Sequence, residues 1–188
     1  MLSLLLPLTV ALPLSARDGG ENLESDIRAS ILKLPTYGPF EAISFQENGG
    51  TVTLSGSVLF GGLKKQAQEA VQEVPGVVVV VNDIQVLPAS ITDDRLRRAV
   101  FNRIYSDGFL SRYGSPVSFR TRGFGRSRFM EVQPFGKYAI HVVVKHGRVT
   151  LYGNVDRAAD RIKAEMLARG VFGVFSVDNR ITVPGRTA

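Results

Sequence analysis

A seven-residue phrase occurs twice in this chain and limits what the chain can fold into. Residues 50–56 read GTVTLSG and residues 147–153 read GRVTLYG, an offset of 147 − 50 = 97. The match continues downstream without a gap, since Ala67 falls on Ala164 and Asn82 on Asn179 at the same offset. A repeat that holds its register over roughly forty residues predicts two copies of one folding unit.

The segment before the repeated phrase aligns at a shorter offset. Ile27 falls on Leu96 and Ile31 on Val100, an offset of 96 − 27 = 69. The second copy therefore carries an insert of 97 − 69 = 28 residues, which we place at about residues 106–138.

Each copy shows the apolar periodicity of an α-β-β-α-β unit. The elements expected in the first copy are a helix over 26–34, a hairpin of strands around 43–45 and 52–58 that turns at 48–50, a helix over 62–74 and a strand over 77–86. We therefore predict an α+β fold of two tandem units. Each would be a small three-stranded mixed sheet with two helices on one face. A unit of about sixty residues is marginally stable alone, so we expect the two to pack together.

The N-terminal residues are typical of an export signal. An apolar run of thirteen residues from Leu2 to Leu14 ends in small residues, too short to span a bilayer but suited to a secretory signal. We expect a signal peptide over 1–16, a flexible N-terminus over 17–23, and a periplasmic or otherwise exported protein. The alternatives are a wrongly set start codon and a buried N-terminal segment.

Charge and cysteine content restrict the classes of partner and site. Residues 1–92 hold 5 Lys+Arg and 9 Asp+Glu, a net of −4, whereas residues 93–188 hold 18 and 8, a net of +10. The second half is therefore expected to attract anionic partners. The alternative is that its positive charge only attracts the negatively charged first half of the same chain. The absence of cysteine excludes disulfides, thiolate metal sites and a cysteine nucleophile.

Several phrases resemble one known family. The strand GTVTLSGSV, the turn VPGV and the closing VNDIQV, together with GRVTLYGNV, GVFGV and VDNRITV, are similar to BON domains, and hyperosmotically inducible periplasmic proteins contain such domains. The resemblance covers residues 24–87 and 93–184. It implies a noncatalytic, envelope-associated module that binds phospholipid and takes part in a stress response, without a cofactor.

Glycines inside strands and turns are expected to be structural. Gly56 and Gly153 interrupt strands, which indicates a close backbone approach, and we expect the first helix of each unit to cross there. Ligand approach to the backbone is the alternative. Gly76 and Gly173 lie in the turns after the second helices. Neither copy has the spacing of a phosphate-binding loop.

The valine run at 77–81 does not alternate with polar residues. Five successive valines indicate a strand covered on both faces. Because helices cover only one face, we expect the other copy to cover the second, or failing that a partner or lipid acyl chains.

Catalysis finds little support in the sequence. The two histidines, His141 on a strand and His146 at a hairpin tip, are not expected to converge, and Asp93 and Asp94 are expected to cap a helix. We predict no enzyme and no metal site.

The insert is the unusual stretch. It interleaves arginines with aromatic residues, and its candidate anion-binding residues are Arg112, Arg120, Arg122, Arg126, Arg128, Lys137, Phe119, Phe124 and Phe129. Arginine forks bind phosphate oxygens, and aromatic rings lie at lipid interfaces or stack on bases. We expect a module that binds phospholipid or envelope proteins. The alternatives are an intracellular nucleic-acid-binding protein, disfavoured if the chain is exported, and a loop whose aromatics only complete the core.

Overall fold

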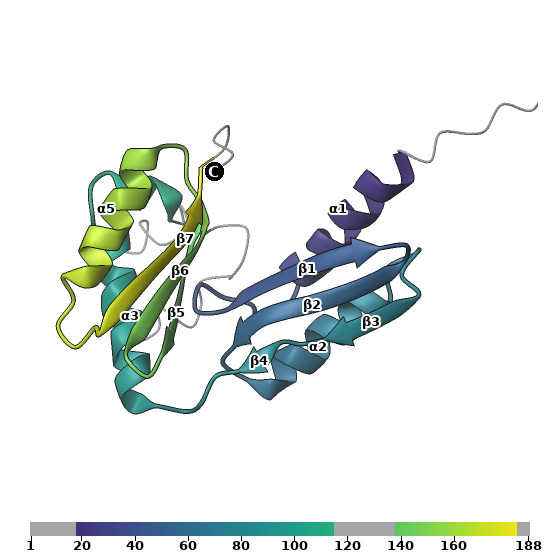
Figure 1. Cartoon of the computed structure of the whole chain (residues 1–188), viewed down its shortest axis with the longest axis horizontal. Helices are drawn as coiled ribbons and strands as arrows, with labels where there is room; N and C mark the ends of the chain where they lie inside the picture. Colours follow the sequence, from purple (N-terminus) through teal and green to yellow (C-terminus); the bar gives the residue numbers. More distant parts are fainter. Residues whose placement is uncertain (1–17, 115–137, 184–188) are drawn as a thin grey trace, which may run out of the picture.

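The computed structural model describes residues 18–114 and 138–183. These form two α+β units that follow one another in the chain, each with its own sheet (Figure 1). The predicted α+β class and the repeated α-β-β-α-β order are confirmed.

The first unit places two helices on one face of its sheet. Its elements are α1 (Asp18–Leu32), β1 (Ala42–Asn48), β2 (Thr51–Val58), α2 (Gly61–Gln72), β3 (Val79–Asn82) and β4 (Gln85–Val86). Strands β1 and β2 form the predicted antiparallel hairpin, and β3 and β4 both run parallel to β2. The helix α1 begins at Asp18, and so includes residues 18–23 that the sequence predicted to be flexible.

The second unit repeats this arrangement with one addition. Its elements are α3 (Ile91–Tyr105), the 3₁₀ helix η1 (Leu110–Tyr113), β5 (Ile140–Lys145), β6 (Arg148–Asn154), α5 (Ala158–Arg169) and β7 (Ser176–Thr182). Strands β5 and β6 are antiparallel, and β7 runs parallel to β6. Each unit buries its own cluster of apolar side chains between sheet and helices.

The two strand glycines avoid an atomic clash within the hairpin. Gly56 and Gly153 have φ of 118° and 129°, a region that side chains disfavour. A Cβ at Gly153 would overlap the carbonyl oxygen of Ala139, the residue just before the paired strand, and one at Gly56 would overlap that of Ala42. The expectation that the first helix crosses at these glycines is wrong, because the close neighbour is the hairpin's other strand.

The first helices instead approach the turn glycines. Gly76 and Gly173 have φ of 97° and 92°. A Cβ at Gly76 would lie 3.4 Å from Leu23 of α1, and one at Gly173 would lie 3.3 Å from Leu96 of α3. The two units thus share a second backbone position that favours glycine.

An asparagine ties the third strand of each unit to its second helix. The Asn82 side chain donates to Lys64 O at 2.9 Å and accepts from Ile84 N at 3.2 Å. Asn179 repeats both bonds with Arg161 O and Ile181 N, at the same lengths. In the first unit the strand breaks just after this asparagine, so the predicted continuous strand over 77–86 appears as β3 and β4.

The valine run is not covered by the second unit. Val79 and Val81 lie on the sheet face away from the helices and are exposed, while Val77 and Val80 pack against the first core. The prediction that the other copy covers the second face of this strand is therefore wrong: the contact between the units lies at β5, on another part of the molecule.

The units meet through residues 37–41, which we call the joint. The Val142 N–H of the edge strand β5 donates to Pro39 O at 2.7 Å, so the joint caps an otherwise open backbone edge (Figure 1). The Phe40 ring packs edge-on against Phe101 of α3, at 5.6 Å between ring centres. The expected contact between the copies therefore exists, and it joins a loop of the first unit to the core of the second.

Buried polar groups complete the joint. His141 Nδ1 lies 2.7 Å from Glu41 O, and the Glu41 carboxylate accepts from Gly38 N at 2.8 Å. Only 4% of Glu41 is exposed, and burial raises the pKa of its carboxyl to about 7, although the N–H of Gly38 and the charge of Arg97 oppose the shift. Burial also lowers the pKa of His141 below its usual value.

Candidate binding surface

Most of the predicted anion-binding residues lie outside the described residues. These are Arg120, Arg122, Arg126, Arg128, Lys137, Phe119, Phe124 and Phe129. The described ends of the predicted insert pack on the second unit, with Leu110, Tyr113 and Tyr138 buried. Tyr138 contacts Phe101 and Tyr105, so aromatic residues at these ends do complete the core.

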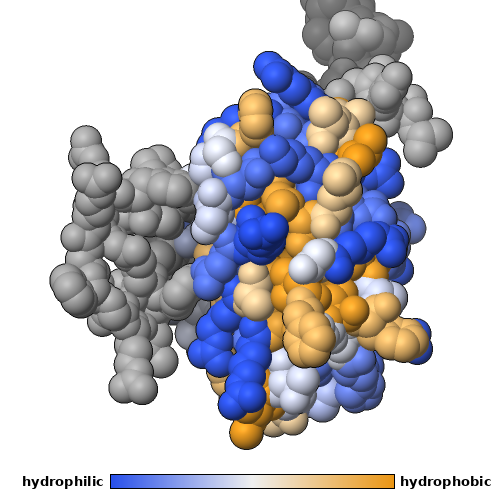
Figure 2. Space-filling model, turned by 90° about the vertical axis from the view of Figure 1, so that its left-hand side faces the viewer, coloured by the Kyte–Doolittle hydropathy of each residue, from blue (hydrophilic) through white to orange (hydrophobic). Residues whose placement is uncertain are grey.

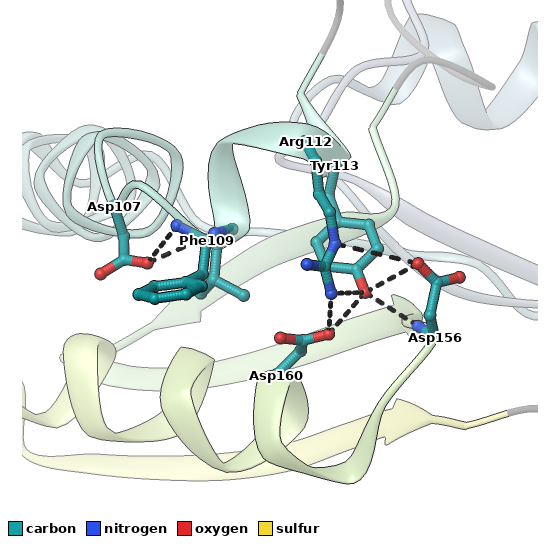
Figure 3. Close-up of polar contacts among 7 residues, drawn as sticks. Asp107, Phe109, Arg112, Tyr113, Asp156 and Asp160 are labelled. Carbon is teal, nitrogen blue, oxygen red and sulfur yellow. Dashed lines mark hydrogen bonds and ion pairs between the residues drawn. The ribbon is translucent and has the colours of Figure 1, made fainter.

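Arg112 is held in a polar network rather than directed freely to solvent (Figure 3). Its guanidinium pairs with Asp160 on α5 and donates to the Tyr113 hydroxyl at 3.0 Å. That hydroxyl lies 2.7 Å from Asp160 and accepts from Asp156 N at 2.9 Å. The network fastens η1 to the start of α5, so the Arg112 guanidinium is already engaged by partners within the second unit.

The Tyr113 hydroxyl supports a stability prediction. Changing Tyr113→Phe removes the partner of the Asp156 N–H and one partner of the Asp160 carboxylate. We expect a loss of about 1–3 kcal/mol of unfolding free energy, measured by chemical denaturation, because part-buried polar groups lose their partner. Phe109→Leu, at an exposed position of the same segment, should change stability by less than about 0.5 kcal/mol. If Tyr113→Phe and Phe109→Leu lost the same amount of unfolding free energy, the Tyr113 hydroxyl would contribute nothing to stability.

A cationic and aromatic surface lies at one end of the second unit. We call it the tip: Lys145, His146 and Arg148 of the β5–β6 hairpin, with Phe172 and Phe175 of the loop between α5 and β7. The backbone bond from Phe175 N to Gly147 O, 2.9 Å long, holds the loop against the hairpin. Phe172 is fully exposed and Phe175 is 75% exposed, and the Arg148 guanidinium lies 5.3 Å from the Phe175 ring centre.

Further apolar side chains of the second unit lie exposed on α5. Ile162 and Met166 of α5 are both more than half exposed. Figure 2, which views the molecule from the side of the second unit, shows hydrophobic patches interleaved with hydrophilic surface. A shallow groove of about 570 Å³ also runs along the sheet beside Lys145, Arg148 and Phe175.

The first unit gives an internal comparison for the tip. At the offset of 97, Phe172 and Phe175 correspond to Pro75 and Val78, and Arg148 corresponds to Thr51. The same backbone bond is present there, from Val78 N to Gly50 O at 2.7 Å. Since the fold forms this end without aromatic or basic residues, the tip's side chains are not required by the fold.

Asp93 holds the tip in place, a role that sequence reasoning missed. Its two carboxylate oxygens accept from His146 N and Gly147 N, each at 2.8 Å. The helix α3 is capped instead by Ser90, whose hydroxyl accepts from Asp93 N. The expectation that Asp93 caps the helix is therefore corrected: its carboxylate reaches a hairpin more than fifty residues away. Asp94 pairs with Arg97.

Arg97 is a buried cation that the sequence did not single out. It is 2% exposed, and its guanidinium donates to Val144 O at 2.8 Å as well as pairing with Asp94. Its Nε atom is buried without a hydrogen-bond partner. Nothing in the local sequence marks this position, because its neighbours on α3 include exposed arginines of the same type.

Neither a metal site nor a membrane-spanning helix is found among the described residues. No cluster of three or more histidine, cysteine or acidic side chains is arranged there to hold a metal ion. None of the helices formed by residues 18–114 and 138–183 has the length and apolarity to cross a membrane. His141 is buried at the joint, whereas His146 lies at the exposed tip.

Comparisons with known proteins agree with the repeated architecture. The sequence matches the BON domain over residues 20–88 and again over 127–185. These two units define a tandem pair of small binding modules, and such modules are in general noncatalytic. The chain belongs to the BON domain family, and the predicted resemblance is confirmed.

The curated proteins give no match, whereas solved structures give distant ones. The structural protein CdsD of the type III secretion system of Chlamydia trachomatis is 15% identical, with a TM-score of 0.28, over 86% of this chain and 92% of that one. A second structure, the C-terminal domain of CdsD, is 13% identical, with a TM-score of 0.26, over 90% of this chain and 99% of that one.

Proposed function

We propose that this chain is a noncatalytic cell-envelope module whose second unit binds anionic phospholipid surfaces through the tip. The observation that carries the proposal is the pair of exposed phenylalanines beside Lys145 and Arg148, at an end where the first unit has neither. Aromatic side chains enter the interfacial region of a bilayer, while cationic side chains are attracted to anionic head groups. The net charge of +10 in residues 93–188 acts in the same direction.

The insert is proposed to contribute to the same binding. Arg120, Arg122, Arg126 and Arg128 alternate with phenylalanines in the sequence, the same combination that the tip presents. Envelope proteins with an acidic surface would be bound by the same charges. Export is proposed from the apolar run Leu2–Leu14 and is tested by cell fractionation with sequencing of the mature N-terminus, where cytosolic protein with residues 1–16 intact would contradict it.

Vesicle binding tests the tip directly. The full chain should pellet with phosphatidylcholine vesicles that contain phosphatidylglycerol, and less with phosphatidylcholine alone. Changing Phe172 and Phe175 together to Ser should weaken binding at least about tenfold, because each buried phenylalanine contributes about 1.5–3 kcal/mol. Changing Lys145 and Arg148 to Gln should reduce the salt sensitivity of binding, since exposed charges act over ~10 Å at 0.1 M salt.

Two matched variants separate the tip from other surfaces. Val78→Ser changes the equivalent exposed position of the first unit and should leave pelleting as in the wild type. Changing Arg120, Arg122, Arg126 and Arg128 together to Ser tests the insert alone. Wild-type pelleting of the tip variants would refute the role of the tip, and wild-type pelleting of the arginine variant would refute that of the insert.

A further inference from the structure

A second hollow, separate from the tip, opens beside the joint. It has a volume of about 500 Å³ and lies between the outer faces of the two sheets. One wall is a row across β5, β6 and β7, where His141 pairs with Tyr152 and Tyr152 with Arg180. The facing wall is the pair Ser44 and Ser55 on β1 and β2. We call this hollow the cleft.

The closing glycine of the repeated phrase lines the cleft in both copies. Gly56 and Gly153 remove side chains from the walls, so backbone and small side chains lie at the surface there. The cleft therefore combines open backbone with a few polar groups at a boundary between domains, which is the usual setting of a small-molecule site.

The polar groups of the cleft have complementary chemistry. The Arg180 guanidinium lies 5.8 Å from the Tyr152 ring centre, and its Nε donates to Asp178 at 2.8 Å. The Arg180 side chain is 61% exposed, and the rest of its donor fork is not used by Asp178. Across the cleft, the Ser44 and Ser55 hydroxyls lie 2.9 Å apart and offer donors and acceptors together.

The first unit again shows that these groups are not required by the fold. At the offset of 97, His141, Tyr152 and Arg180 correspond to Ser44, Ser55 and Asp83. Thus the second unit has an aromatic ring at Tyr152 and a cation at Arg180, where the first unit has a serine hydroxyl and a carboxylate. Because the joint turns the two rows towards one cleft, the difference between the copies produces one asymmetric site.

We propose that the cleft binds a small acidic sugar. The sugar ring packs on Tyr152, its carboxylate pairs with the Arg180 fork, and its hydroxyls bond to Ser44 and Ser55. An arginine fork matches a carboxylate in two parallel hydrogen bonds, and an aromatic face suits the apolar face of a ring. The site lies four residues along β5 from the tip, so this proposal does not rest on the tip's binding to membranes.

Nuclear magnetic resonance titration of the ¹⁵N-labelled full chain with D-glucuronate tests the proposal. We expect saturable shifts of the amides of Gly56, Gly153 and Arg180. Arg180→Gln should weaken binding at least about tenfold, since a hydrogen bond to a charged group contributes about 1.5–3 kcal/mol. Tyr152→Ala should also weaken binding, because it removes the aromatic face on which the sugar ring packs. Arg103→Gln, an exposed arginine on α3 behind the opposite face of the sheet, is the matched control and should bind as the wild type does.

Two further probes identify the chemistry. D-glucose provides the ring without the charge, and acetate provides the charge without the ring; both should bind at least about tenfold more weakly than glucuronate. Equal binding of acetate would reduce the cleft to a simple anion site, and equal binding of glucose would remove the role of Arg180. Either result, or the absence of saturable shifts, would overturn the proposal. Vesicle pelleting of Tyr152→Ala should remain normal, which keeps the two functions distinguishable.

Discussion

Changing Gly153→Ala should destabilise the chain by about 3 kcal/mol, the combined effect of a strained φ and of forced movement of the paired strand. The added Cβ would overlap the Ala139 carbonyl oxygen, and the φ of 129° disfavours any side chain. Because backbone atoms cannot rotate away as a side chain can, the hairpin itself has to open. Thermal unfolding of the full chain should show a midpoint roughly 6–12 °C lower.

Gly61→Ala is the matched control for this loss. Gly61 begins α2, and no atom lies within 4 Å of its ideal Cβ position. There alanine should keep or raise stability, by up to about 1 kcal/mol, since it loses less chain entropy in a helix. If both alanines had the same small effect, the doubled phrase would need another explanation.

The second large effect concerns the pH dependence of the joint. The folded-state pKa of Glu41 is raised from 4.5 to about 7, mainly by burial. The protonated carboxyl is therefore favoured in the folded chain. Its contribution to stability is fully present below pH 4.5 and is lost as the pH rises through 7. At about 1.4 kcal/mol per pKa unit, the loss is about 3 kcal/mol.

Glu41→Gln should remove this dependence. Glutamine is neutral at every pH and its side-chain oxygen can still accept from Gly38 N. Denaturant titrations at several pH values between 5 and 8 should therefore show the variant gaining stability relative to the wild type as the pH rises. Glu73→Gln, at an exposed position on the first unit, controls for the loss of one negative charge. A constant difference between Glu41→Gln and wild type across this range would contradict the burial argument.

His141 acts in the opposite direction at lower pH. Its pKa is lowered by burial, so the folded chain favours the neutral ring. That contribution is present above pH 6.5 and is lost as the pH falls through the lowered value. The variant His141→Gln should therefore lose less stability than the wild type on acidification below pH 6.

The sequence predicted those features that depend on local pattern. The offset of 97 between the glycine-flanked phrases identified two units, and the Asn48-Gly49-Gly50 turn identified the first hairpin. Both depend on interactions within a few residues or on direct comparison of the copies. The general class of binding module followed from the same phrases.

Features that depend on contacts between distant residues were missed. Asp93 carries the signature of a helix start, yet its carboxylate binds a hairpin that only the fold brings near. The valine run indicated a strand covered on both faces. The two units instead meet where Phe40 packs on Phe101 and Pro39 bonds to β5, and no local pattern in the sequence marks these contacts. The tip could not be predicted either, because the exposure of Phe172 and Phe175 and their position beside the hairpin depend on how the chain folds.

The cap that Pro39 places on β5 also bears on how this protein could be divided. A strand whose backbone groups are unpaired is a template for other strands, and natural proteins protect such edges. If proteolysis separated residues 37–41 from the second unit, the edge strand β5 would lose the hydrogen bond that Pro39 O accepts from Val142 N. A second unit without residues 37–41 should therefore self-associate more readily than the intact chain, which light scattering of the two would show.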